Sequence, residues 1–196
     1  MATFLTISGS PAPGSATDHV LSQHVTPRLV TSGHRTEHLV LRELPAAALL
    51  LGHLHHPRLT HAAELLGAAE GIVVGTPVYK AAYSGLLKTF LDVMPRTGLA
   101  GRRVLQLVVG HSPADGRLTH EALDTVLASM GASTPAERCF VPSRTARALQ
   151  NPPHEATSRE VTAHEVTAHE AIGRELDAAV DRLCTPAANR PEKRAA

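Results

Sequence analysis

The sequence predicts a single α/β domain built around a doubly wound parallel sheet. Short β-type runs alternate along the chain with longer runs whose apolar residues recur at helical spacing, which is typical of strands joined by crossover helices. Residues 104–109 are almost continuously apolar, as expected of a parallel strand that helices cover on both faces. The chain has 196 residues, enough for one well-buried core and too few for two ordinary domains.

Each element is predicted from a local pattern. Val20, Val25 and Leu29 lie at helical spacing and give the first helix one apolar face. Pro95 and Gly131 mark the ends of two later helices, because proline cannot continue a helix and glycine favours the position after one. In chain order the predicted elements are strand 4–7, helix 16–31, strand 37–41, helix 59–69, strand 71–74, helix 84–94, strand 104–109, helix 118–130, strand 139–141 and helix 155–183.

Five strands alternating with five helices predict a doubly wound sheet with helices on both faces. In the flavodoxin-like strand order 2-1-3-4-5, the chain reverses direction between strands one and three, and ligands bind beside that point. The loops that follow these strands, residues 8–17 and 76–84, would then line one crevice at the carboxyl edge. We therefore predict the order 2-1-3-4-5 and a binding site in that crevice.

The domain is expected to cover residues 1–185. Residues 186–196 have no apolar periodicity and are expected to form a disordered tail. A pentad pattern repeats over residues 154–173. Five residues advance a helix by about 140° beyond a full turn, so the repeat cannot hold one face and is expected to lengthen a surface helix.

Charge and composition exclude several classes of protein. Nineteen Lys plus Arg against eighteen Asp plus Glu give a formal charge of +1, which is no footprint for nucleic acid or an anionic membrane. No apolar run approaches the roughly 20 residues of a membrane span, and the N-terminus lacks the basic segment of a signal peptide. We therefore expect a cytoplasmic protein, with Cys139 and Cys184 as reduced thiols.

The thirteen histidines do not predict a metal site. His164 and His169 are spaced i, i+5, not the i, i+4 that places two imidazoles on one helix face. His53, His55 and His56 lie in a loop-like segment without cysteine or carboxylate partners at ligand spacing. The chain also has no GxSxG turn for a serine nucleophile.

The loop at residues 8–17 has the composition of a phosphate site. Phosphate binds where several donors converge close to a helix N-terminus. The candidate hydroxyls are those of Ser10, Ser15 and Thr17. The alternative is an ordinary loop in which a Ser or Thr caps the helix. Asp18 and His19 follow among these hydroxyls and are included with them as candidate cofactor-binding residues. The Asp18 carboxylate is unfavourable near a phosphate unless it turns outward or caps the helix.

The most informative segment is the loop after the third strand. A sharp strand-to-helix turn with a proline, a tyrosine and small residues suits a flat aromatic ligand, because the backbone can approach the ring closely. Both tyrosines of the chain, Tyr79 and Tyr83, lie in this segment, although only 3% of residues are aromatic. The alternative is a structural turn in which Tyr79 packs into the core.

These two loops together resemble a known family. The turn Ser8-Gly9-Ser10-Pro11 and the run Thr76-Pro77-Val78-Tyr79-Lys80-Ala81-Ala82-Tyr83-Ser84-Gly85 are similar to those of the NADPH-dependent FMN reductases that supply two-component monooxygenases. The likeness is greatest to the reductases of bacterial alkanesulfonate utilisation. It covers roughly residues 4–141 and is strongest over residues 71–95.

The resemblance implies reduction of FMN by NADPH or NADH through hydride transfer to flavin N5, after which reduced FMN leaves for a monooxygenase. The cofactors carry this chemistry, so we assign no catalytic residue. The flavin ring is expected along Pro77, Val78 and Tyr79, with Thr76 opening the same loop. Gly110 and His111 stand where the family has a small glycine-containing turn; His111 either donates to a flavin carbonyl or faces solvent.

One departure from the family concerns the phosphate. The family usually carries an arginine after the Ser-Pro pair, and Ala12 offers no charge there. Loosely held FMN is therefore expected, which suits a reductase that uses flavin as a substrate. The family's habit and the apolar helix 84–94 also predict a homodimer or homotetramer. Two alternatives share the fold: an FMN-containing quinone or azo reductase, and a non-catalytic flavodoxin-like electron carrier.

Overall fold

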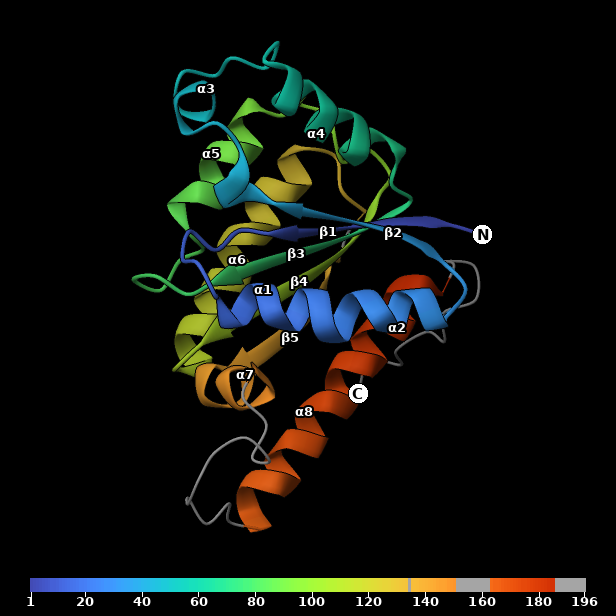
Figure 1. The fold of residues 1–196 in the computed structure, drawn as a ribbon, viewed down its shortest axis with the longest axis vertical. Helices are drawn as coiled ribbons and strands as arrows, with labels where there is room; N and C mark the ends of the chain where they lie inside the picture. Colours follow the sequence, from blue (N-terminus) through green and yellow to red (C-terminus); the bar gives the residue numbers. More distant parts are fainter. Residues whose placement is uncertain (134, 151–162, 186–196) are drawn as a thin grey trace.

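The computed structural model describes residues 1–133, 135–150 and 163–185, with the side chains of the last stretch described from residue 170. Within this part, five parallel strands form one sheet with helices on both faces (Figure 1). The strands are β1 (Thr3–Ser8), β2 (Arg35–Val40), β3 (Gly71–Pro77), β4 (Arg103–Gly110) and β5 (Glu137–Pro142). Their order is β2-β1-β3-β4-β5, which confirms the predicted topology.

The helices cover the sheet in two groups. A continuous helix along one face consists of α1 (Ala16–Val20), a π-helical turn η1 (Leu21–Val25) and α2 (Thr26–Thr31). The later elements are the 3₁₀ turn η2 (Leu41–Glu43), α3 (Ala46–Leu50), α4 (Pro57–Ala68), α5 (Gly85–Val93), α6 (Pro113–Ser129), α7 (Ser143–Gln150) and α8 (Ala163–Cys184). None of the helices in the described ranges combines the length and apolar character of a bilayer span.

Strand side chains alternate between two cores, as the two-residue period of a strand requires. Phe4 and Val73 pack on one side against α1, η1, α2 and α8, whereas Leu5 and Ile72 pack on the other side against α3 to α6. Both pairs are fully buried or nearly so. The central strands are thus covered on both faces, which explains the continuous apolar run of β4.

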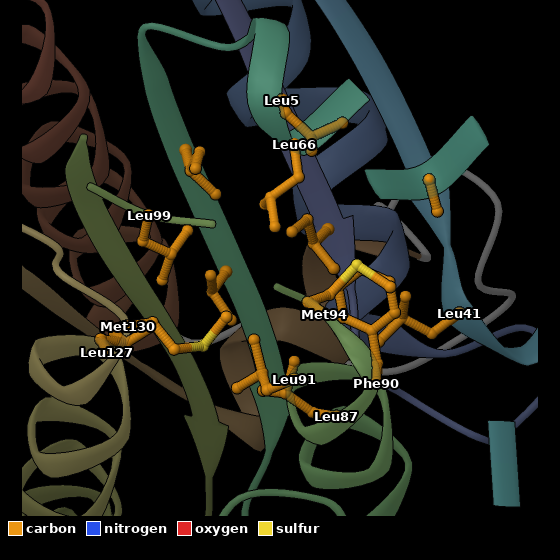
Figure 2. Close-up of a cluster of buried hydrophobic side chains, with 14 of the residues drawn as sticks. Leu5, Leu41, Leu66, Leu87, Phe90, Leu91, Met94, Leu99, Leu127 and Met130 are labelled. Carbon is orange, nitrogen blue, oxygen red and sulfur yellow. The ribbon is translucent and has the colours of Figure 1, made fainter. Parts of the chain in front are cut away.

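Helix α5 contributes most of its apolar residues to the core of its own chain. Phe90 and Met94 lie close to Leu41 of η2 in Figure 2, and Leu87 and Leu91 are equally buried. Helix α5 contacts η2 and α3 as well as the core side chains of the strands. The apolar side chains of this helix were one reason to predict an interface between subunits. Most of them pack inside their own chain instead.

Several element boundaries differ from prediction. Helices α3 and α7 were not predicted. Helix α3 spans a single short apolar run, and helix α7 is mostly polar. Helix α6 begins at Pro113, five positions before the predicted start, with the Ser112 hydroxyl accepting from the Asp115 N–H at 3.4 Å. Helix α8 ends within one residue of prediction. Its predicted start at residue 155, residues 154–162 of the pentad repeat and the tail at 186–196 lie outside the described residues. The rest of the repeat, residues 163–173, forms the start of α8.

Candidate functional site

The loops after β1 and β3 lie side by side at the carboxyl edge of the sheet, as the strand order requires. The Gly9 N–H donates to the Gly75 carbonyl at 2.8 Å. The Ser84 hydroxyl donates to the Gly9 carbonyl at 2.5 Å and accepts from the Leu87 N–H at 3.1 Å. One buried serine therefore joins the two loops and caps α5.

A pocket of about 270 Å³ opens where these loops meet. It is lined by the loop after β1, the loop after β3, the end of β4 and helix α7. Its lining residues are Ser10, Ala12, Gly14, Ser15, Ala16, Thr17, Pro77, Val78, Tyr79, Val109, His111, Ser143, Arg147 and Gln150. The crevice predicted from the strand order thus contains Ser10, Ser15, Thr17, Pro77, Val78, Tyr79 and His111 of the predicted site residues.

Two further predicted residues shape the pocket without lining it. Thr76 is buried, and its hydroxyl donates to the Pro77 carbonyl at 3.0 Å and accepts from the Ser84 N–H at 3.0 Å. A Cβ on Gly110 would lie 2.7 Å from Val78 Cγ2, so any side chain there would displace Val78. The Val78 N–H also donates to the Val109 carbonyl at 2.8 Å. These contacts hold Val78 against the end of β4.

Asp18 turns away from the pocket. Its carboxylate lies 3.1 Å from His38 Nε2 and accepts from Arg42 Nη1 at 3.2 Å. Burial alone would raise the pKa of Asp18, but its contacts with Ser8, His38 and Arg42 outweigh burial and hold the pKa below the usual 3.8. The carboxylate is therefore charged and compensated, and Asp18 is not among the residues that line the pocket.

His19 also has a partner outside the pocket. Its Nε2 lies 3.1 Å from the Leu149 carbonyl, and this contact fastens α1 to α7. Asp18 and His19, both predicted as cofactor ligands, thus connect α1 to its neighbours, and neither is among the residues that line the pocket.

Three hydroxyl-bearing residues of the loop at residues 8–17, Ser10, Ser15 and Thr17, all line the pocket. Ser15 occupies the N-cap position of α1, yet its side chain makes no capping hydrogen bond. The alternative of an ordinary capped loop is therefore not realised at Ser15. Ser10 and Thr17 are each 2% exposed, and the Ser10 hydroxyl accepts from the Ala12 N–H at 3.4 Å.

Tyr79 opens a tight turn at the pocket and is 47% exposed, which rules out the core-packed alternative. Reciprocal backbone hydrogen bonds join Tyr79 and Ala82 at 2.8 and 3.1 Å. Lys80 and Ala81 between them have φ values of 55° and 60°, as in a type I′ turn. Tyr83 instead packs against the core, where burial raises its pKa.

Helix α7 supplies the part of the pocket that sequence reasoning missed. Ser143, Arg147 and Gln150 all line the pocket, and they are spaced i, i+4 and i+7. This spacing places the three polar side chains on one helix face. It is the sequence pattern from which they could have been predicted as pocket residues. Helix α7 lies beside the start of α1 (Figure 1).

A second polar cluster lies on the α6 side of the sheet. His120 Nδ1 donates to Gln106 Oε1 at 2.8 Å, and Gln106 Nε2 donates to Asp124 Oδ1 at 2.6 Å. Arg138 pairs with the other oxygen of Asp124. Burial, followed by the charge of Arg138, lowers the pKa of His120 to about 4, so the imidazole is neutral. Among the described residues no group of three or more His, Cys, Asp or Glu could hold a metal ion.

A comparison with known protein families identifies the family of this chain. The model of the NADPH-dependent FMN reductase family matches residues 2–146, which is more than half of the chain. The chain belongs to this family. The cofactors of this family are FMN and a reduced nicotinamide nucleotide, so the residues of the pocket are compared with the groups of FMN.

Individual relatives support the same assignment. The chain is 35% identical over 136 residues to an FMN reductase (NADPH) of Pseudomonas putida, covering 69% of this chain and 68% of that protein. It is 36% identical over 128 residues to an FMN reductase (NADPH) of Escherichia coli K12, covering 65% and 66%. Among solved structures, an NADH:FMN oxidoreductase in its apo form has 30% identity and a TM-score of 0.77, covering 93% and 88%.

Proposed function

We propose that this protein is an NAD(P)H-dependent FMN reductase that supplies reduced FMN to a separate flavin-dependent monooxygenase. The observation that carries the proposal is the pocket at the junction of the loops after β1 and β3, in a chain of the FMN reductase family. The relatives are named for NADPH and the solved structure for NADH, so both nucleotides are candidate reductants.

The residues present fit FMN. The hydroxyls of Ser10, Ser15 and Thr17 offer donors to a phosphate, and no carboxylate is among the lining residues. Val78 and the half-exposed Tyr79 offer an apolar wall to a flat ring. When bound, FMN supplies the redox chemistry, as the acceptor of a hydride from the nicotinamide. The chain's own part is to bind and orient the rings and to exclude water.

Steady-state oxidation of NADPH and NADH tests the activity, with FMN, FAD, riboflavin and a quinone as acceptors. The expected result is turnover that depends on the concentration of added FMN, by a protein that loses its flavin on desalting. Turnover without added flavin that saturates with a quinone would establish the quinone reductase alternative. Flavin binding without nucleotide oxidation would establish the electron carrier.

Supply to a monooxygenase requires that reduced FMN leave the protein. Anaerobic reduction followed by rapid ultrafiltration should recover most of the reduced FMN in the filtrate. Retention of the reduced flavin by the protein would contradict a role as a supplier.

We also propose a cytoplasmic homodimer or homotetramer, on the family's habit. The burial of α5 within its own chain removes one argument for this assembly. Leu50 and Leu51 at the end of α3 are 76% and 67% exposed and are the apolar residues that an interface would cover. Light scattering at micromolar concentration decides the question, and a monomer mass would refute the assembly.

A further inference from the structure

The loop at residues 8–17, where the FMN phosphate is proposed to bind, offers no cation. Ala12 stands where the family usually carries an arginine, and Asp18 is paired with Arg42 outside the pocket. A phosphate monoester carries close to two negative charges at neutral pH. Hydroxyls alone would leave that charge uncompensated, so another element has to supply the cation if FMN binds here.

Helix α7 brings an arginine to this place. Arg147 lines the pocket together with Ser10, Ser15 and Thr17. Arginine is always charged, and its planar group donates several hydrogen bonds in a fork that matches phosphate oxygens. Of the residues that line the pocket, Arg147 is the one with a permanent positive charge.

The position of Arg147 is fixed by contacts between α7 and the phosphate loop. Gln150 Nε2 donates to the Gly14 carbonyl at 3.0 Å, and His19 Nε2 lies 3.1 Å from the Leu149 carbonyl. Thr145 and Ala146 of the same helix are buried against the rest of the protein. The cation is therefore carried by a helix that is fastened directly to the loop it faces.

Arg147 has no ion pair or hydrogen bond through its guanidinium within the described ranges. Five other arginines in the described ranges are paired with carboxylates. These pairs are Arg28 with Asp181, Arg42 with Asp18, Arg117 with Glu121, Arg138 with Asp124 and Arg182 with Glu137. An unpaired arginine that lines one pocket with three hydroxyl-bearing residues is the arrangement that an anion with several acceptor oxygens would complete.

We propose that Arg147 and the hydroxyls of Ser10, Ser15 and Thr17 form a phosphate-monoester subsite, in which Arg147 replaces the cation missing at Ala12. This inference rests on the proposed function, because the ligand assigned to the subsite is the 5′-phosphate of FMN. The 2′-phosphate of NADPH has the same chemistry, and the experiment separates the two. The consequence is that Arg147 sets the preference for FMN over riboflavin.

The test measures flavin binding by quenching of flavin fluorescence, without turnover. Arg147→Ala and Arg147→Gln remove the charge, and Arg147→Gln keeps a long helix-forming side chain in case the shorter one perturbs α7. A lost hydrogen bond to a charged group predicts a tenfold to hundredfold rise, in order of magnitude, in the Kd for FMN. The Kd for riboflavin should change less than about twofold, since riboflavin has no phosphate.

Arg144→Ala is the matched control, because Arg144 lies on the same helix, is exposed and does not line the pocket. It should leave both flavin affinities unchanged. Thermal melts by circular dichroism show that each variant folds. FMN binding by the wild type should also weaken with added salt, and this dependence should be flatter in Arg147→Gln.

Each result decides the proposal. Equal losses for FMN and riboflavin, or no loss for either, would overturn it. A raised KM for NADPH relative to NADH, with an unchanged Kd for FMN, would overturn the flavin assignment and place the nicotinamide nucleotide's phosphate at Arg147. A wild type that binds neither flavin would refute the proposed function itself, which these variants cannot do.

Discussion

At the scale of single residues, Ser15 and Asp18 show how local partners determine a role. They lie three positions apart at the start of one helix. The Ser15 hydroxyl does not cap that helix, so it is available to a ligand. The Asp18 carboxylate is held by His38 and Arg42, so it connects α1 to β2 and η2. The sequence predicted both residues as cofactor-binding, but it carried no information about the partners His38 and Arg42 that hold the Asp18 side chain.

The double change Ser15→Ala with Thr17→Ala should weaken FMN far more than riboflavin. Both residues line the pocket, and a lost hydrogen bond to a charged group costs roughly 1.5–3 kcal/mol. We expect the Kd for FMN to rise about tenfold to hundredfold, measured by fluorescence titration. Loss of cap stability should be small, because Ser15 makes no capping bond. Equal losses for both flavins would mean that the loop only supports the fold.

Asp18→Ser should destabilise the protein and leave FMN binding within about twofold. The change removes the acceptor shared by His38 and Arg42, which predicts a loss of roughly 1–2 kcal/mol in the free energy of unfolding. Urea unfolding measures the loss. Asp92→Ser is the control, because its pair with Lys88 is exposed and should contribute less than about 1 kcal/mol. A marked tightening of FMN by Asp18→Ser would show that the carboxylate faces the phosphate after all.

At the scale of elements, strong apolar periodicity made the sheet and its main helices predictable from sequence. The strand order then placed residues 10–17 and 77–79 in one pocket. The contribution of α7 was not predictable in the same way. This helix is largely polar, and its position depends on a contact between Leu149 and His19, which are 130 residues apart in the chain. A local pattern carries no information about such a contact.

The turn at Tyr79 makes a prediction about strain. Ala81 has a φ of 60°, and the left-handed region costs a residue with a Cβ roughly 1–2 kcal/mol. Glycine adopts this region freely, although it loses more chain entropy on folding. Ala81→Gly should therefore raise the free energy of unfolding by about 0.5–1 kcal/mol in urea titrations. Ala82→Gly, outside the positive-φ pair, should lower it. Destabilisation by both changes would contradict a strained Ala81.

At the scale of the whole molecule, the polar cluster at His120 joins three elements through the interior. Gln106 comes from β4, His120 and Asp124 come from α6, and Arg138 comes from β5. Gln106 is fully buried in the middle of β4, so its amide depends on His120 and Asp124 for its hydrogen bonds. Protonation of His120 would place a second cation beside Arg138. The cluster therefore connects the protein's stability to pH.

Stability should fall in acid because His120 resists protonation in the folded state. Its pKa is about 4 when folded, against 6.5 for an exposed histidine. Between these values the unfolded chain binds a proton that the folded protein does not. The His120 contribution is thus complete above pH 6.5, declines as the pH falls towards 4, and is lost below that value. The difference between pH 7.5 and pH 4.5 is expected to be roughly 2 kcal/mol in the free energy of unfolding.

His120→Asn isolates this contribution, because an asparagine amide can still donate to Gln106 and does not titrate in this range. The free energy of unfolding of both proteins is measured in urea at several pH values. Subtracting one from the other removes the effect of the titrating groups that they share. The wild type should lose roughly 2 kcal/mol more than the variant on acidification from pH 7.5 to pH 4.5. Parallel stability curves would show that the folded protein accepts a proton at His120 as readily as the unfolded chain, and a direct NMR titration of the imidazole would then give a pKa near 6.5.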